Sequence, residues 1–419
     1  MYMLLDRAFK MVVKTGALTV ISADGKPHAY GDGRGTPVTM RMTNDRAARR
    51  IAIDADLAIG EEYMNGGFVL EKGTIYDLLE LLLKNAGSIS DYPPVAQALY
   101  KMRVGLKRLD QYNPIGKAQA NVAHHYDLSG KLYDLFLDRD RQYSCAYFEN
   151  DAASLEDAQL AKKRHLAAKL DIKPGMKVLD IGSGWGGLGL YLAEICGADV
   201  TGVTLSEEQH KLSNERAQQR GVADHVKFKL LDYRNLDQKF DRIVSVGMFE
   251  HVGVGHYKEF FQKVRWLLKD DGVAALHSIN RSDGPGATSA WIKKYIFPGG
   301  YIPALSEVLP HIEKNGLYVT DIEILRLHYA KTLREWGKRF HDNRARAEEI
   351  YDERFCKMWE FYLAASECAF RYAGMNNFQI QFVKDQNVLP LTRGYIEEAE
   401  ARLRALEEKR PRLKSIPAE

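Results

Sequence analysis

The pattern of apolar and polar residues changes near residue 120. Beyond that point, short apolar runs alternate with helical stretches, and turns follow the carboxyl ends of the runs. Five such runs stand in order: KVLDIG (177–182), ADVTGVTLS (198–206), VKFKLLD (226–232), FDRIVSVG (240–247) and GVAALHSIN (272–280). This alternation predicts a parallel sheet covered by helices. Two later runs, ILRLHYA (324–330) and FQIQFVK (378–384), are predicted to close the sheet as its last strands.

Residues 1–115 have a different pattern and predict a smaller α+β domain. The segment opens with an amphipathic helix, and short strand-like runs follow at 16–22 and 38–43, before a helical stretch at 74–85. One stripe of the first helix carries Leu4, Leu5, Ala8, Phe9, Val12 and Val13. This stripe either packs on its own domain or, since lysine and arginine flank it, lies against lipid.

We expect residues 116–394 to form the catalytic domain and residues 395–419 to form a charged helix and tail with a solvated face. Within the catalytic domain, Ser154 and Asp157 form a potential capping box. They predict a helix that runs to about Leu170.

Composition narrows the function classes. The net charge is +3 over 419 residues, too small to predict a nucleic-acid partner. The four cysteines are far apart, which argues against a zinc site and favours a reducing compartment. The N-terminus lacks the pattern of a secretory signal. Nothing approaches the roughly 18 consecutive apolar residues that a spanning helix needs.

The glycine-rich turn after the first strand of the sheet predicts the cofactor. Asp180 ends the strand, and Gly182, Gly184 and Gly186 follow in the pattern DxGxGxG. Glycine allows close backbone approach and positive φ, and ligands of open α/β sheets bind at this switch point. The spacing is typical of class I S-adenosylmethionine (SAM) methyltransferases, with a seven-stranded Rossmann-like sheet. A nicotinamide or flavin domain is the alternative.

The next strand departs from the common pattern. Most dinucleotide and SAM enzymes end it with an acid that binds the ribose. Here Thr204 occupies that position, and Gln209 follows one helical turn later.

Several motifs together identify a family. They are HHYDLSG (124–130), YSCAYF (143–148), LDIGSGWGG (179–187), GVTLSEEQ (202–209), FEHVG (249–253), HSI (277–279) and HYAKTL (328–333). With them the chain resembles the SAM-dependent cyclopropane-fatty-acyl-phospholipid synthase family, which is related to the mycolic-acid cyclopropane synthases. The N-terminal module resembles the extra lipid-handling domain of the phospholipid-type members.

The resemblance implies two sets of site residues and no metal. SAM would be held by Tyr143, Ser144, Asp180, Gly182, Gly184, Thr204, Gln209, Tyr233 and Arg234, with the last two near the adenine. A bicarbonate ion would be held at a catalytic pocket made by Cys145, Glu250, His277, Ile279 and Tyr329. Tyr362, in an aromatic-rich helix, is expected to face the acyl-chain tunnel.

The chemistry explains these residue types. An alkene is a poor nucleophile without a proton to remove, so activation of a serine or cysteine does not help. After methyl transfer the acyl chain carries a cation so acidic that a weak base suffices, and bicarbonate, held by fixed donors, fits this role. Cys145 is therefore interpreted as a small residue that shapes the anion pocket. Glu250 could instead cap a helix, and His277 could belong to the core. His251, and likewise His124 and His125, are read as structural or supporting residues.

The resemblance predicts transfer of the SAM methyl to the cis double bond of an unsaturated phospholipid, followed by ring closure. A methyl-branched or methylene product and a small-molecule N-methyltransferase remain alternatives. A bilayer substrate implies reversible membrane contact by a cytoplasmic protein at the inner membrane surface. Family members also form homodimers, so a homodimer is expected here.

Overall fold

A computed structural model describes residues 2–87, 94–111 and 130–409. The predicted boundary at residues 115 and 116, and His124 and His125, lie outside these ranges. The described chain divides into two compact units. One comprises 1–110, 286–300 and 333–375, and the other comprises 111–285, 301–332 and 376–419.

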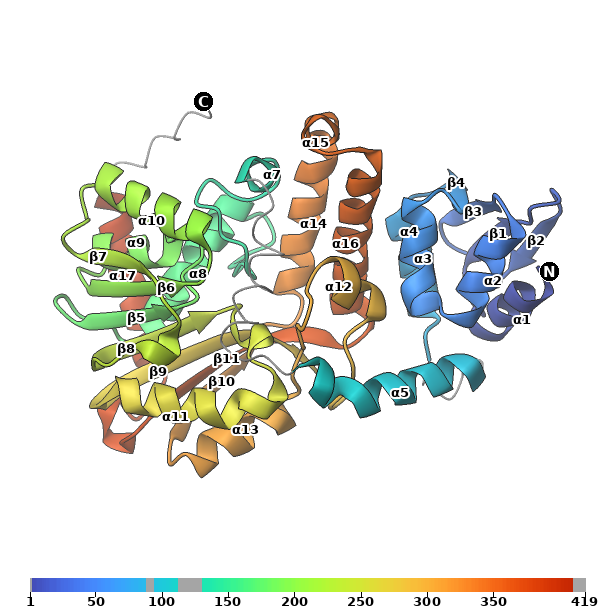
Figure 1. Cartoon of the computed structure of the whole chain (residues 1–419). Coiled ribbons are helices and arrows are strands. Elements are labelled where there is room, and N and C mark those ends of the chain that lie inside the picture. Colours follow the sequence, from blue (N-terminus) through green and yellow to red (C-terminus); the bar gives the residue numbers. More distant parts are fainter. Residues whose placement is uncertain (1, 88–93, 112–129, 410–419) are drawn as a thin grey trace. The chain divides into compact units, whose positions relative to one another are not determined.

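The division differs from the expected one because two late segments group with the N-terminal residues. Figure 1 shows the course of the whole chain. The first unit has a four-stranded sheet in the order β2-β1-β3-β4. Its strands are β1 (Ala17–Ile21), β2 (Pro27–Tyr30), β3 (Pro37–Met42) and β4 (Phe68–Lys72). Its helices are α1 (Met3–Val12), α2 (Asp45–Ile53), α3 (Ala55–Met64), α4 (Ile75–Lys84), α5 (Pro94–Asp110), α12 (Ala290–Tyr295), α15 (Arg344–Ile350) and α16 (Glu353–Tyr372), with most of α14 (His328–Asp342).

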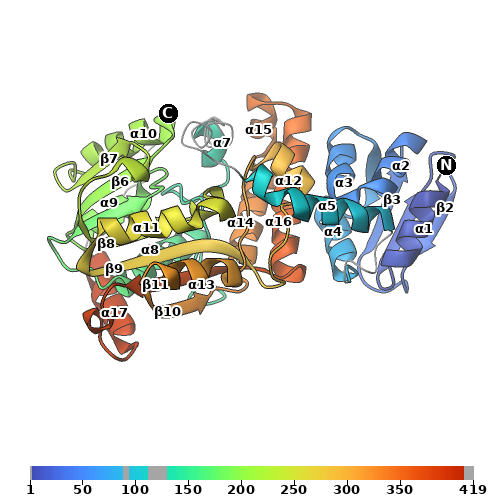
Figure 2. The same cartoon turned by 60° about the horizontal axis from the view of Figure 1, so that its bottom comes forward.

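The late helix α16 joins the first unit by packing on α3 and α4 (Figure 2). Tyr362 belongs to this helix, is buried, and contacts the rings of Trp359 and Phe297. The first helix, α1, buries Leu5 and Phe9 as its stripe predicts, whereas Leu4 is exposed. Together with the four-stranded sheet, this helix confirms the α+β character expected for the N-terminal residues.

The second unit contains the predicted seven-stranded sheet, in the order β10-β11-β9-β8-β5-β6-β7. Its strands are β5 (Lys177–Ile181), β6 (Asp199–Thr204), β7 (Val226–Leu230), β8 (Phe240–Val246), β9 (Leu268–Arg281), β10 (Tyr318–Ile324) and β11 (Met375–Val383). The pairs β5–β6, β6–β7, β5–β8 and β8–β9 are parallel, and β10–β11 is antiparallel. The strand order reverses between β5 and β8, which places the ligand-binding switch point at the carboxyl end of β5.

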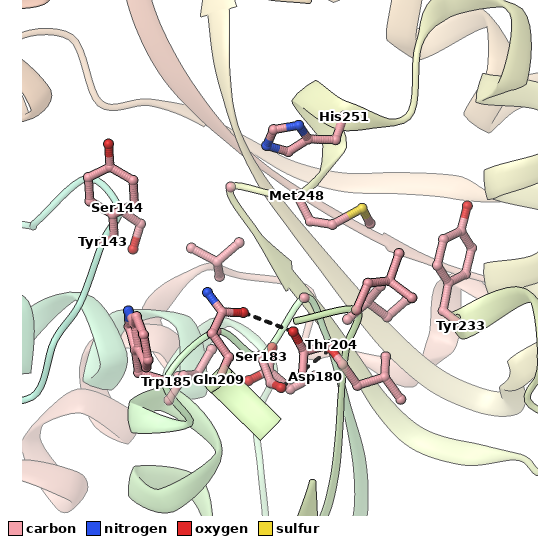
Figure 3. A pocket seen from close by; sticks show the side chains of 18 of the residues that line it. Tyr143, Ser144, Asp180, Ser183, Trp185, Thr204, Gln209, Tyr233, Met248 and His251 are labelled. Carbon is pink, nitrogen blue, oxygen red and sulfur yellow. Dashed lines mark hydrogen bonds between the residues drawn. The ribbon is translucent and has the colours of Figure 1, made fainter. Parts of the chain in front are cut away.

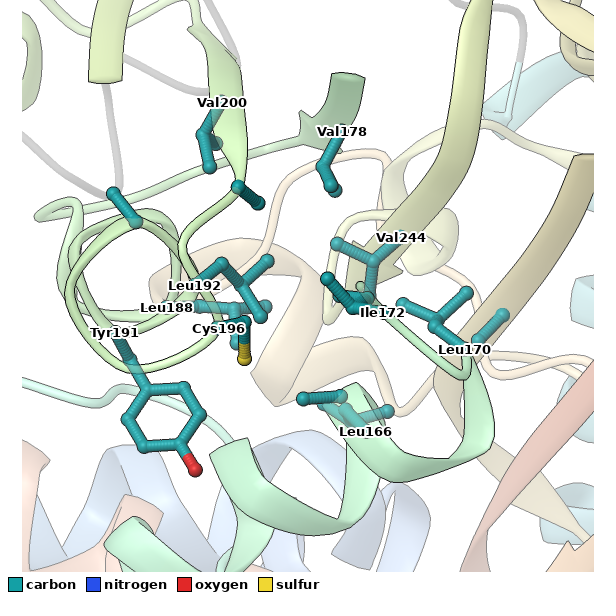
Figure 4. Packing of buried hydrophobic residues seen from close by; sticks show 14 of the residues in the cluster. Leu166, Leu170, Ile172, Val178, Leu188, Tyr191, Leu192, Cys196, Val200 and Val244 are labelled. Carbon is teal, nitrogen blue, oxygen red and sulfur yellow. The ribbon is translucent and has the colours of Figure 1, made fainter. Parts of the chain in front are cut away.

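Helices cover both faces of this sheet. They are α8 (Leu155–Lys169), α9 (Gly187–Glu194), α10 (Glu207–Gln219), α11 (Tyr257–Leu267), α13 (Leu305–Lys314) and α17 (Gly394–Lys409), and a short α7 (Gly130–Asp134) precedes them. One core cluster joins α8, α9 and α17 to the strands, and Figure 4 shows its centre around Leu166, Leu192 and Val244. A second cluster joins α11 and α13 to the other face.

Two sequence predictions need correction. The predicted strand 324–330 is wrong, because β10 ends at Ile324 and α14 begins at His328. Arg326, between them, has φ of 47°, which ends the extended backbone. The tail helix α17 is not merely solvated, since Ile396 and Leu403 are buried in the core. The predicted cap of α8 is confirmed, because the backbone N–H of Asp157 donates to Ser154 Oγ at 3.1 Å.

Candidate active site

The turn after β5 can lie close to its neighbours because its glycines adopt positive φ without a side chain. Gly182 and Gly186 have φ of 82° and 83°, where a side chain is unfavourable. A Cβ on Gly182 would also come within 2.8 Å of Met248 Cβ. The backbone N–H groups of Gly182 and Ser183 donate to the carbonyl of Val203, which joins the turn to β6. This geometry holds the turn at the switch point.

A cavity opens above this turn, within the second unit (Figure 3). All nine residues predicted to bind SAM line it: Tyr143, Ser144, Asp180, Gly182, Gly184, Thr204, Gln209, Tyr233 and Arg234. They come from the segment before α8, the ends of β5 and β6, the start of α10 and the residues after β7. Residues from four separate parts of the sequence thus share one cavity.

The end of β6 presents a hydroxyl and an amide where many related folds have an acid. Thr204 Oγ1 donates to Gln209 Oε1 at 2.8 Å, drawn as a dashed line in Figure 3. Ser206 caps α10 by accepting from the backbone N–H of Gln209, which fixes the start of that helix. The amide oxygen is therefore engaged, and the Gln209 amide nitrogen remains as a donor.

Asp180 is a buried acid whose Oδ2 has no hydrogen-bond partner among the described residues. Burial raises the pKa of Asp180 to about 7. A buried polar atom without a partner is unfavourable, so a ligand that brings N–H or O–H donors to this wall would stabilise it. SAM carries both kinds of donor, and the cavity therefore fits it.

Sequence reasoning missed several lining residues, among them Trp185, Asp232, Met248 and His251. His251 was interpreted as structural, yet it lines the cavity, and burial lowers its pKa to about 4. Asp232 carried a usable signal, because an acid directly after a strand end stands at the ligand-binding edge. It accepts two hydrogen bonds from the Arg234 guanidinium, at 2.9 and 2.7 Å, so this arginine already has its counter-charge.

Glu250 lies in a single helical turn, η3 (Phe249–His251), between the lining residues Met248 and His251. Its Oε1 accepts from the backbone N–H of Ile279 at 2.6 Å. Its Oε2 is buried without a hydrogen-bond partner among the described residues. Burial raises the pKa of Glu250 to about 7, which suits a group that exchanges a proton near neutral pH.

His277 lies inside β9, which continues to Arg281, rather than at the strand end as expected. Its two ring nitrogens, Nδ1 and Nε2, lie 3.2 Å from Gln379 Nε2 and 3.4 Å from Asn377 Nδ2. Burial lowers the pKa of His277 to about 3, so the ring is neutral at pH 7. Neither His277 nor Glu250 lines the cavity, and Ile279, two residues after His277, is bonded to Glu250.

Cys145 is fully buried, and its thiol donates to the carbonyl of Ala146 at 3.3 Å. Burial raises the pKa of this thiol above its usual value. A thiol that keeps its proton is neither a strong nucleophile nor a metal ligand. The interpretation that Cys145 shapes an anion pocket stays a prediction.

The segment that follows Cys145 is bonded to the first turn of α14, which carries Tyr329. The backbone N–H of Ala146 donates to Thr332 Oγ1 at 3.0 Å, and that of Phe148 donates to His328 Nδ1 at 2.9 Å. Tyr329 lies between these two contacts in sequence and is buried. The motifs YSCAYF and HYAKTL, 180 residues apart, are thus neighbours.

Comparison with known proteins identifies the family. A family model described as mycolic acid cyclopropane synthetase matches residues 115–380, and one described only as a domain of unknown function matches residues 4–92. The chain is 36% identical over 346 residues to the cyclopropane-fatty-acyl-phospholipid synthase of Escherichia coli K12, covering 83% of this chain and 88% of that protein. It is 34% identical to the tuberculostearic acid methyltransferase UfaA1 of Mycobacterium tuberculosis, covering 88% of each.

Among solved structures, the mycolic acid cyclopropane synthase CmaA1 in complex with SAH and CTAB aligns with a TM-score of 0.61 at 34% identity. The alignment covers 65% of this chain and 99% of that one. The family model spans more than half of the chain, and both curated relatives align along most of their length. The chain therefore belongs to the family of SAM-dependent cyclopropane synthases.

Proposed function

We propose that this protein transfers the methyl group of SAM to the cis double bond of an unsaturated phospholipid acyl chain and closes a cyclopropane ring. One observation carries the proposal: Glu250, a buried glutamate with a raised pKa, stands in the turn between Met248 and His251, which line the same cavity as all nine predicted SAM residues. The E. coli relative, which bears the name of this activity, supports the choice of lipid.

SAM, when bound, supplies an electrophilic methyl group that an alkene can attack. The residues of this chain would hold it in the cavity. Asp180, Thr204 and Gln209 offer polar partners, and Tyr233 offers an apolar ring that packs edge-on against Phe260. SAH in the related CmaA1 structure supports the same ligand here.

Ring closure requires a base at the new methyl group. We propose that a bicarbonate ion serves as this base, with Glu250 as the group that accepts its proton. The unpartnered Oε2 and the raised pKa of Glu250 fit that role. The Ile279 N–H already donates to Glu250, so this donor would act by orienting the carboxylate. The Tyr329 hydroxyl, the His277 ring and the backbone near Cys145 are the remaining donors proposed for the anion.

The acyl chain must be drawn from a bilayer, and we propose reversible contact of a cytoplasmic homodimer with the inner membrane surface. No helix in the described ranges is long and apolar enough to cross a membrane. Helix α1 exposes Met3, Leu4 and Met11 alongside the exposed cations Arg7 and Lys10. An interfacial helix combines these two kinds of residue. Tyr362 is proposed as a wall of the acyl tunnel.

The match to UfaA1 favours a second candidate, methyl transfer without ring closure. Both candidates share the SAM cavity and the methyl transfer, and they differ in the fate of the acyl cation. Loss of a methyl proton with formation of a C–C bond closes the ring, loss of a chain proton leaves a methyl-branched alkene, and a hydride shift followed by loss of a methyl proton leaves a methylene group. Incubation of the protein with SAM and vesicles of cis-unsaturated phospholipid, followed by mass spectrometry of the released fatty acids, separates them. We expect a saturated ring with one added carbon. A methyl-branched or methylene product would establish the second candidate, and no lipid product despite SAM binding would refute both.

A further inference from the structure

Helix α8 forms hydrogen bonds to residues 142–144, which line the SAM cavity. Lys162 Nζ donates to Ser144 Oγ at 2.7 Å and to Gln142 Oε1 at 2.8 Å. From the preceding turn, Gln159 Nε2 donates to the carbonyl of Ser144 at 3.0 Å. Lys162 is only 1% exposed. A buried lysine thus holds two side chains that line the cavity.

Lys162 differs from the other buried bases of α8. Those bases have acids within ion-pair distance: Lys163 with Asp140, Arg164 with Glu149 and Glu407, His165 with Glu323 and Glu400, and Lys169 with Asp321 and Glu323. Among the described residues, no carboxylate lies that close to Lys162. Asp138, Asp140 and the wall residue Asp180 interact with it from farther away. Burial lowers the pKa of Lys162 to about 8, so it is still mostly protonated at pH 7. A buried charge without a counter-ion is unfavourable.

The arginines that line the cavity are less able than Lys162 to balance the charge of an anionic ligand, because each already has an acidic partner. Arg141 forms two hydrogen bonds to Asp134, both at 2.6 Å, and Arg234 is bonded to Asp232. Lys162 is therefore the cation near this wall, within the described part of the chain, that still lacks an acid.

The direction of the hydrogen bonds matters as well. An ammonium group only donates, so the Ser144 oxygen must accept from Lys162. The hydroxyl hydrogen of Ser144 is then left for another acceptor, and Ser144 lines the cavity. Lys162 thereby makes Ser144 a hydrogen-bond donor, and a charge behind that donor strengthens it.

We propose that Lys162 is a positioning residue that, through Ser144, supplies the buried positive charge for the carboxylate at the methionine end of SAM and of its product S-adenosylhomocysteine (SAH). This inference rests on the proposed binding of SAM in this cavity. Lys162 lies outside all the family motifs named above, so the resemblance does not imply this role for α8.

Two ligands separate this role from simple support of the segment. SAH carries the carboxylate, whereas 5′-methylthioadenosine keeps the adenosine and the sulfur and lacks the amino-acid group. Isothermal titration calorimetry gives the dissociation constant of each for the full chain and for Lys162→Met. We expect the variant to bind SAH about tenfold more weakly, the loss of one charge-assisted interaction, and to bind methylthioadenosine within about twofold of wild type.

Matched variants control for damage to the fold. Lys169→Met removes an equally buried lysine from the same helix, where it is paired with Glu323 at 2.6 Å, and should leave the ratio of the two affinities unchanged. Lys162→Gln keeps a donor near Ser144 without the charge, serves also if Lys162→Met does not fold, and should lose SAH affinity similarly. In a Ser144→Ala background, Lys162→Met should cost much less than it does alone.

Equal losses of affinity for both ligands, or full SAH affinity in Lys162→Gln, would overturn the inference. Lys162 would then only support the segment that contains Ser144. A wild-type protein that binds neither ligand would instead refute SAM binding in this cavity. The two failures are therefore distinguishable.

Discussion

Replacing Glu250 with glutamine tests the proposed role of Glu250 as the proton acceptor through both activity and stability. The substitution keeps the size of the side chain and an oxygen that can accept from the Ile279 N–H, but it removes the group that takes up a proton. A positioned base contributes about 10²–10⁴ in rate. We expect Glu250→Gln to reduce the rate of lipid product formation by at least about 100-fold, while the dissociation constant for SAH stays within about twofold.

The stability effect can be worked out from the raised pKa. Glu250 has a pKa of about 7 in the folded protein and 4.5 as its ordinary value. The folded state therefore holds a proton that the unfolded state releases between these values, and wild type loses stability as pH rises from about 4.5 to 7. At about 1.4 kcal/mol per pKa unit, the loss specific to Glu250 between pH 5 and pH 8 is about 2–3 kcal/mol.

Glutamine does not titrate, so the free energy of unfolding of Glu250→Gln relative to wild type should rise by this amount between pH 5 and pH 8. Urea unfolding of both proteins at the two pH values measures the difference, and other titrating groups largely cancel. An unchanged difference would show that Glu250 is not a buried, protonated acid. A fully active variant would show that it is not part of the proton path.

Three further substitutions test single features of the site, with product formation and SAH binding as the measurements. Cys145→Ser should retain activity within about tenfold, because the buried thiol is not a nucleophile; an inactive variant with normal SAH affinity would contradict this. Tyr329→Phe should lose about 100-fold in activity with unchanged SAH affinity, since it removes one donor from the proposed anion site; near-normal turnover would exclude that role. Gly182→Ala should lower the free energy of unfolding by about 1–3 kcal/mol and weaken SAH binding, because φ is 82° and the new Cβ would meet Met248 at 2.8 Å; a thermal denaturation curve like that of wild type would contradict the strain.

The core of the sheet could be predicted because its five parallel strands are short apolar runs that end at turns. The edge strand β10 could not. Its large apolar residues, Tyr318, Ile322 and Ile324, are exposed, whereas Asp321 and Glu323 point to partners on α8. A strand whose charged side chains face the protein interior does not show apolar residues on its buried side. The sequence therefore predicted the strand at the more apolar run 324–330.

The residues predicted to bind SAM share one cavity, and their gathering could be predicted because most of them belong to motifs at strand ends. Lys162 could not be, since a lysine in a helix normally indicates a solvated face. Here almost the whole length of α8 is buried, and its other buried bases are paired with acids far away in sequence, whereas Lys162 is bonded to Ser144 and Gln142. The place of His251 at the cavity was not predicted for a related reason, because only the folded chain shows which residues of η3 line the cavity.

The central claim is that the acyl cation loses its proton from the transferred methyl group. SAM with a fully deuterated methyl group, vesicles of cis-unsaturated phospholipid and mass spectrometry of the released fatty acids test it most directly. Ring closure predicts a saturated cyclic product that has kept two of the three deuterium atoms. A methyl-branched product that has kept all three would contradict the claim, because the proton would then have come from the acyl chain.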